Sequence, residues 1–190
     1  MIMQCLEFGY DSVMIDGSEL PLEENIRRTA EVVSRAHALG IAVEAELGYV
    51  PKLGQQEVTT SGLTDPEEAA WFVEATGVDM LAVAIGTAHG FYKHEPRIDF
   101  DRLSTIRERV EIPLVLHGGS GLSAEIWQES IRRGIAKINF ATEIKDTFVR
   151  GVKAVLSGSD EIDLRKTFPQ AMQNVTRLVA SKMKICRMEN

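Results

Sequence analysis

Two histidines follow two apolar, strand-like runs of this chain. His89 follows residues 80–88, and His117 ends the run 112–117, which leads into a glycine-rich stretch. In a parallel sheet fed by helices, the C-terminal strand ends gather at one mouth. Two imidazoles placed there could bind one metal ion, because neutral imidazole is a preferred ligand of zinc. A lone histidine in such a loop is more often a structural residue, so it is the pairing that favours a metal.

The glycine-rich stretch after the second histidine is a candidate phosphate loop. Residues 118–121 hold three glycines and a serine, and Ser123 then caps a helix. Such a turn exposes backbone N–H groups near a helix N-terminus, where a phosphate is stabilised; a tight turn with no ligand is the alternative. The next strand ends in residues 139–143, and the loops after the last two strands of a barrel often share one phosphate. Thr142 could then donate from its hydroxyl or its backbone.

Acidic residues lie near the ends of two other strand-like runs. Glu44 and Glu46 point to the same side of the sheet, because side chains alternate with period two. Two carboxylates on one face are costly if buried unpaired. Either they bind donors of a helix or loop, or Glu46, nearer the C-terminal end, faces the metal or substrate. Asp16 ends another strand-like run and is a candidate to organise the mouth of the sheet. Alternatively, it caps the helix near Pro21.

The elements that position these residues follow an α/β pattern. Short β-rich runs alternate with longer amphipathic segments, which is typical of βαβ units and a parallel sheet. The sequence predicts strands at 12–16, 41–47, 80–86, 113–117 and 135–140. It predicts helices at 22–39, 66–76, 124–133, 144–156 and 164–185, with Asp65 and Ser123 as N-caps. Five strands do not close a (β/α)₈ barrel, which typically has about 250 residues. Because residues 1–8 read as the tail of a helix without its own strand, we expect an N-terminal truncation.

The composition is that of an ordinary soluble protein. Hydrophobic residues at 44% and charged residues at 26% exclude a disordered chain, and a net charge of −7 argues against a nucleic-acid-binding face. No run approaches the roughly 20 apolar residues that cross a bilayer, and the start lacks a signal-peptide pattern. Cys5 and Cys186 have no metal-type spacing and favour a reduced setting. We expect one domain over residues 1–190, in the cytoplasm, with no nucleic-acid or membrane partner.

Five successive segments closely resemble the class II ketose-bisphosphate aldolases, and the tagatose-bisphosphate type looks nearest. These segments are SVMID (12–16), VEAELG (43–48), LAVAIGTAHG (81–90), PLVLHGGSG (113–121) and KINFATE (137–143). The resemblance runs in order from the first residues to the C-terminal helices. It implies a partial TIM (β/α)₈ barrel, with about five of the eight βα units, the C-terminal helices, and the first three strands missing.

The resemblance also implies an activity and a set of site residues. The family is a zinc-dependent lyase that reversibly cleaves a ketose bisphosphate into dihydroxyacetone phosphate and an aldehyde such as glyceraldehyde 3-phosphate. His89 and His117 match two of its three zinc ligands, and Zn²⁺ acts as a Lewis acid on the ketose oxygens. Glu57 matches a loop glutamate implicated in proton transfer, and Glu46 is the second candidate catalytic carboxylate. The expected substrate contacts are Gly90, Gly118, Gly119, Ser120, Asn139, Phe140, Ala141 and Thr142.

This chain departs from the family pattern, and the departures leave alternatives open. The family's third histidine ligand and its acid–base aspartate lie on the strands that have no counterpart here. Catalytic zinc normally keeps three protein ligands, so two histidines hold it weakly unless Glu46 contributes. The chain is then either an aldolase, an inactive truncated aldolase that needs an N-terminal partner, or a metal-free phosphate-binding barrel isomerase. Expected partners are a phosphorylated ketose and either a second copy of the chain or a missing N-terminal segment.

Overall fold

The computed structural model describes residues 1–52 and 62–188 and contains one parallel five-stranded sheet. Each strand pairs with the next one along the chain, in the order β1-β2-β3-β4-β5. The strands are β1 (Ser12–Asp16), β2 (Ala42–Leu47), β3 (Met80–Val83), β4 (Leu114–Leu116) and β5 (Ile135–Ile138). This sequential parallel order is that of a (β/α) barrel wall. The predicted α/β, partial barrel fold is therefore confirmed.

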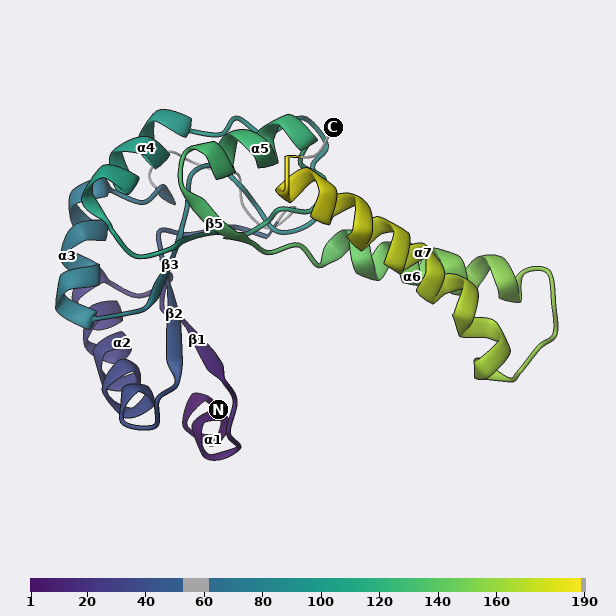
Figure 1. Cartoon of the computed structure of the whole chain (residues 1–190), viewed down its shortest axis with the longest axis horizontal. Coiled ribbons are helices and arrows are strands. Elements are labelled where there is room, and N and C mark those ends of the chain that lie inside the picture. Colours follow the sequence, from purple (N-terminus) through teal and green to yellow (C-terminus); the bar gives the residue numbers. More distant parts are fainter. Residues whose placement is uncertain (53–61, 189–190) are drawn as a thin grey trace.

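Helices alternate with the strands and cover one face of the curved sheet, as Figure 1 shows for α2 to α5. The described helices are α1 (Ile2–Glu7), α2 (Leu22–His37), α3 (Pro66–Thr76), α4 (Phe100–Arg109), α5 (Ala124–Arg132), α6 (Thr142–Leu156) and α7 (Leu164–Cys186). Six of these agree with the predicted segments to within a few residues. Helix α4 was not predicted, because charged side chains separate its few apolar residues.

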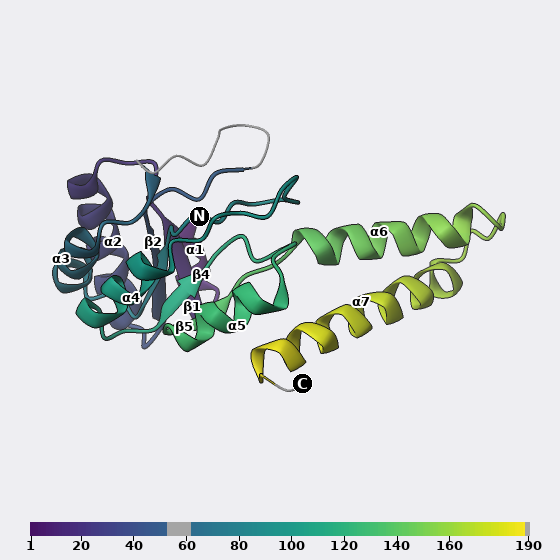
Figure 2. The same ribbon diagram turned by 90° about the horizontal axis from the view of Figure 1, so that it is seen from above.

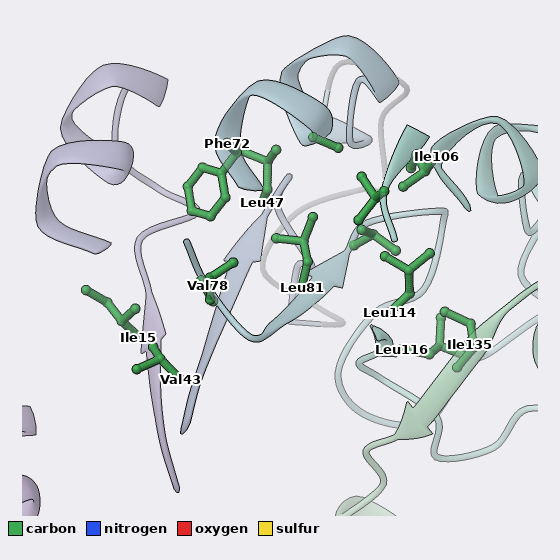
Figure 3. Close-up of a cluster of buried hydrophobic side chains, with 14 of the residues drawn as sticks. Ile15, Val43, Leu47, Phe72, Val78, Leu81, Ile106, Leu114, Leu116 and Ile135 are labelled. Carbon is green, nitrogen blue, oxygen red and sulfur yellow. The ribbon is translucent and has the colours of Figure 1, made fainter. Parts of the chain in front are cut away.

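The core lies between the sheet and these helices. Side chains from the strand faces, such as Leu47, Leu81 and Leu114, point toward Phe72 of α3 and Ile106 of α4 (Figure 3). All five are buried, so the removal of apolar surface from water fixes which face of each strand meets the helices. The intervening strand residues must then point to the opposite side of the sheet.

Two of the predicted N-caps are present, and a third predicted role is wrong. The Oδ1 atom of Asp65 accepts hydrogen bonds from the backbone N–H groups of Glu67 and Glu68, at 2.9 and 3.1 Å. The Ser123 hydroxyl accepts one from the N–H of residue 126 at 3.3 Å. Asp16 does not cap α2, whose N-cap residue is Pro21 and which has no side-chain cap bond; the Oδ1 atom of Asp16 accepts instead from the N–H and hydroxyl of Ser18, at 3.0 and 2.7 Å.

Helices α6 and α7 form a hairpin that projects away from the sheet (Figures 1 and 2). The rings of Phe148 and Phe168 pack edge to face between the two helices, with centroids 5.3 Å apart. Gly151 allows the backbones to approach closely, since a Cβ atom added there would lie 2.8 Å from the Cα of Ala171. Within the described ranges, no helix has the length and apolar character required to traverse a bilayer.

Candidate active site

The ends of β3 and β4 bring the two histidines together. His89 lies in the loop that follows β3, and His117 is the residue after β4. Their ring centroids are 6.1 Å apart and the ring planes are inclined by 49°. His117 is buried, whereas His89 is exposed at the mouth. The expected meeting of the two imidazoles at one edge of the sheet is therefore observed, and their role as metal ligands stays a prediction.

Two buried carboxylates hold the ring of His117 from both sides. Its Nε2 atom lies 3.0 Å from Oε1 of Glu44, and its Nδ1 atom lies 2.8 Å from Oε2 of Glu46. The second oxygen of Glu44 accepts a hydrogen bond of 2.6 Å from the Nζ atom of Lys137 on β5. The two glutamates share one side of the sheet, as their spacing predicts. Their partners are His117, directly after β4, and Lys137 of β5, which lie beyond the neighbouring strand β3, and not helix donors.

This arrangement separates the protonation states of the two histidines. Burial alone would lower the pKa of His117, but its hydrogen bonds to Glu44 and Glu46 outweigh burial and raise that pKa to about 9. Burial would raise the pKa of Glu44, yet the bonds from His117 and Lys137 hold it below its usual value. The pKa of His89 is lowered, mainly because its packed side loses hydration. The pKa values of the two histidines are therefore shifted in opposite directions.

The described residues fit a zinc ion in part. Two imidazoles face one space, and Glu46, which bonds His117, also exerts the largest charge effect on the pKa of His89. A carboxylate on the far nitrogen of a histidine, as Glu44 is on His117, is the usual support of a metal-bound imidazole. In residues 1–52 and 62–188, however, no three His, Cys, Asp or Glu side chains form a complete metal site. The described residues therefore supply two zinc ligands, and a complete site needs more.

A cavity of about 460 Å³ opens beside the two histidines. Its lining residues are His89, Gly90, His117, Gly118, Ser120, Ile138, Asn139, Phe140, Ala141 and Thr142. Seven of the eight predicted substrate contacts are therefore gathered around one space. Gly119 lies behind the lining, where its N–H donates to the Asn139 carbonyl at 2.9 Å. The predicted catalytic Glu57 lies outside the described residues.

The loops that follow β4 and β5 both line this cavity, and Ser120 joins them. Its hydroxyl oxygen lies 3.1 Å from the backbone nitrogen of Thr142 and 3.5 Å from that of Glu143, and it accepts from both N–H groups. The N-cap residue of α6, Ala141, makes no side-chain bond of its own. A serine from the glycine loop therefore caps the helix that begins after β5. The two loops therefore meet at the N-terminus of α6, where the helix dipole favours an anion.

Close backbone approach explains why a glycine follows His117. Gly118 has φ of +71°, and a Cβ atom there would lie 2.5 Å from the carbonyl oxygen of Ala88. Any larger residue would therefore push the loop of His89 away from the loop of His117. The glycine keeps the two histidine-bearing segments at their observed separation.

Two residues of the site were not predicted. Lys137 interrupts an apolar strand, and its charge signals a buried acidic partner, which the structure identifies as Glu44. The Tyr92 hydroxyl accepts from the Ala88 N–H at 2.7 Å and lies 3.0 Å from the Gly118 carbonyl, so it bridges both histidine loops. Burial raises the pKa of Tyr92 to about 12, so it stays a donor. Nothing in its local sequence distinguishes it from other loop tyrosines.

Comparison with known proteins gives consistent matches along the whole chain. The family described as fructose-bisphosphate aldolase class-II matches residues 1–190. The YdjI aldolase from Escherichia coli K12 is 39% identical with a TM-score of 0.83, over 97% of this chain and 64% of that one. A protein from Coccidioides immitis, assigned as a fructose-1,6-biphosphate aldolase, is 31% identical with a TM-score of 0.85, over 98% and 67%.

A third structure supports the fold alone. The fructose-bisphosphate aldolase from Campylobacter jejuni is 24% identical with a TM-score of 0.76, over 94% of this chain and 61% of that one. The chain thus spans about two thirds of the length of these three proteins.

Proposed function

The chain belongs to the class II fructose-bisphosphate aldolase family, and from this membership we propose that it carries the phosphate site and part of the metal site of an aldehyde-lyase. The reaction is the reversible cleavage of a ketose bisphosphate into dihydroxyacetone phosphate and an aldehyde such as glyceraldehyde 3-phosphate. The observation that carries the proposal is the cavity itself. Its lining combines His89 and His117 with residues of the glycine loop and of the start of α6.

The phosphate of the substrate is proposed to bind between the two loops that Ser120 joins. The N–H groups at the start of α6 carry the positive end of the helix dipole, which favours an anion. Gly118 and Gly90 line the cavity, and Thr142 offers a hydroxyl at the helix start. These groups fix one end of the ketose, so that its carbonyl end extends toward the two histidines.

The histidines are proposed to hold Zn²⁺, which when bound supplies Lewis-acid stabilisation of the negative charge that develops on the ketose oxygens. Glu44 orients the ring of His117, and Lys137 holds Glu44 in place. Glu46 bonds His117 and exerts the largest charge effect on the pKa of His89, so we assign it to ligand binding or to proton transfer. Glu57 stays a prediction for proton transfer.

The metal site needs a further ligand, since catalytic zinc usually keeps three from the protein. A second copy of the chain or a separate polypeptide segment is the partner that we propose for this role. The resemblance to the tagatose-bisphosphate type favours a substrate of that kind, while the choice between epimers depends on the geometry around the aldehyde end. An aldolase fragment that is inactive without such a partner, and a metal-free isomerase, are the competing functions.

Zinc content, ligand binding and cleavage together test this proposal. We expect zinc in the purified protein, binding of dihydroxyacetone phosphate, and loss of zinc in His117→Ala. His94→Ala, which removes an exposed histidine away from the cavity, is the matched control and should keep its metal. Unchanged zinc in His117→Ala would overturn the metal assignment. Zinc and ligand binding without cleavage would favour the inactive fragment, and ligand binding without zinc would favour the isomerase.

A further inference from the structure

A buried lysine of the C-terminal helix lies directly behind the proposed phosphate loops. Lys182 of α7 is only 7% exposed. Its Nζ atom donates a hydrogen bond to Oε1 of Glu143 at 3.1 Å, and it lies 2.9 Å from Oε2 as an ion-pair contact without hydrogen-bond geometry. The same ammonium lies 4.7 Å from the ring centroid of Trp127 and 5.9 Å from that of Phe140.

Each of these three contacts belongs to a segment that forms the cavity. Glu143 is in the first turn of α6, where its N–H points to the Ser120 hydroxyl. Phe140 lines the cavity. Trp127 donates from its indole Nε1 to the Gly119 carbonyl at 3.0 Å and packs against Phe140 with ring centroids 5.3 Å apart. One side chain of α7 thus supports both phosphate loops from behind.

The ion pair of Lys182 and Glu143 has an electrostatic effect in addition to packing. An acidic side chain in the first turn of α6 is favourable toward the helix dipole, but it competes with, and repels, a phosphate held at the same helix end. The positive charge of Lys182 offsets that of Glu143 at close range. A buried ion pair is seldom the most stabilising choice, because an apolar side chain of similar volume often serves stability as well. Stability alone therefore does not account for a lysine at this position.

We propose that Lys182 is a positioning residue for phosphate binding. It neutralises Glu143 and holds the start of α6 against α5, so that the Glu143 carboxylate does not repel a phosphate bound beside the helix start. This inference rests on the phosphate site of the proposed function. It assigns to the α6–α7 hairpin an indirect role in phosphate binding, because Lys182 acts through Glu143 and does not itself contact the ligand.

A double-mutant cycle tests the proposal, with dihydroxyacetone phosphate and inorganic phosphate as the probes. Lys182→Met leaves the charge of Glu143 uncompensated, so we expect about a tenfold loss of affinity for both probes. Adding Glu143→Gln removes the repelling charge, and the double variant should recover to within about threefold of the original affinity. Zinc content should be the same in all four proteins. Lys166→Met, on the same helix but in an exposed pair with Glu161, is the control and should bind normally.

The outcomes separate this inference from the function on which it rests. If the unaltered protein binds neither probe, the phosphate site itself is wrong. If it binds both probes and Lys182→Met binds them equally well, the positioning role is overturned. If affinity is lost and the double variant does not recover, Lys182 acts by packing alone, which also overturns the proposal. Should Lys182→Met fail to fold, Lys182→Gln keeps a hydrogen-bond donor without the charge and carries the same expectations.

Discussion

At the scale of single residues, the chemistry of the site depends on what binds the ring of His117. In the absence of metal, a proton on each nitrogen satisfies Glu44 and Glu46. A metal ion would take one nitrogen and leave Glu44 on the other, as in other metal-bound histidines. Because Lys137 anchors Glu44, the side of Glu46 is the one free to change. If the proposed metal ion binds here, the imidazole would exchange a proton for a cation and keep its bond to Glu44.

This arrangement predicts how the stability of the metal-free protein depends on pH. The pKa of His117 is raised from 6.5 to about 9 in the folded state, so its stabilising effect is complete below about pH 6.5 and is lost as the pH rises toward 9. The difference corresponds to a loss on the order of 3 kcal/mol. Urea unfolding in the presence of a chelator should show this decline. His94→Ala should retain it, whereas an equal decline in His117→Gln would contradict the assignment.

Thr142→Val tests the phosphate site at the same scale. The substitution keeps the shape of the side chain and removes the hydroxyl at the start of α6, so a hydrogen bond to a charged phosphate is lost. We expect about a tenfold weaker affinity for dihydroxyacetone phosphate, measured by calorimetry, with unchanged zinc content. Thr105→Val makes the same exchange on α4, where the hydroxyl bonds a backbone carbonyl, and serves as the control. Equal affinity in Thr142→Val would remove this residue from the site.

At the scale of elements, caps and close contacts decide where helices begin. Asp65 directly precedes α3 and caps it, so this capping motif can be recognised from the sequence. The cap of α6 comes instead from Ser120, which is more than 20 residues earlier. Only the folding of β4 beside β5 brings this hydroxyl to the helix start. The arrangement of the two loops, which we propose to bind phosphate, thus depends on strand pairing and not on either loop alone.

The cap of α3 gives a prediction about stability. Asp65→Ala removes the acceptor of two backbone N–H groups and should lower the free energy of unfolding by about 1 kcal/mol. Asp65→Asn, which keeps a capping oxygen, should lie close to the unaltered protein. Urea titration at neutral pH is the measurement. If the alanine variant were as stable as the asparagine variant, the cap would not contribute.

At the scale of the whole molecule, a curved sheet and a projecting hairpin meet beside the proposed anion site. The sheet and helices α2 to α5 form one body, and the α6–α7 hairpin extends from it (Figure 2). Lys182 lies where the hairpin returns to the sheet, in contact with Trp127 of α5. The hairpin therefore needs its two helices in a fixed relation if the lysine is to reach Glu143.

The close approach of the two hairpin helices is a testable part of this arrangement. Gly151→Val introduces a side chain where even a Cβ atom would lie 2.8 Å from the Cα of Ala171, so we expect a loss of about 2 kcal/mol in stability. Phosphate affinity should fall as well. Gly158→Val is the control, because the nearest atom to a Cβ there is 3.9 Å away. Similar stabilities of the two variants would show that the helices do not need this contact.

The sequence by itself determined the strands, most of the helices and the residues at the strand ends. Local patterns carry this information: period two in the strands placed Glu44 and Glu46 on one side, and cap residues marked helix starts. Segments similar to an aldolase family added the expected roles. Helix α4 was not predicted, because its few apolar residues are separated by charged residues and do not form a clear helical pattern.

Only the tertiary structure decided which partners these residues have. That Glu44 bonds both His117 and Lys137, that Ser120 caps α6, and that Lys182 reaches Glu143 all depend on contacts between residues far apart in the chain. Such contacts follow from the pairing of whole strands and the packing of whole helices. No local pattern encodes them, because the free energy that selects them comes from burial spread over the entire fold.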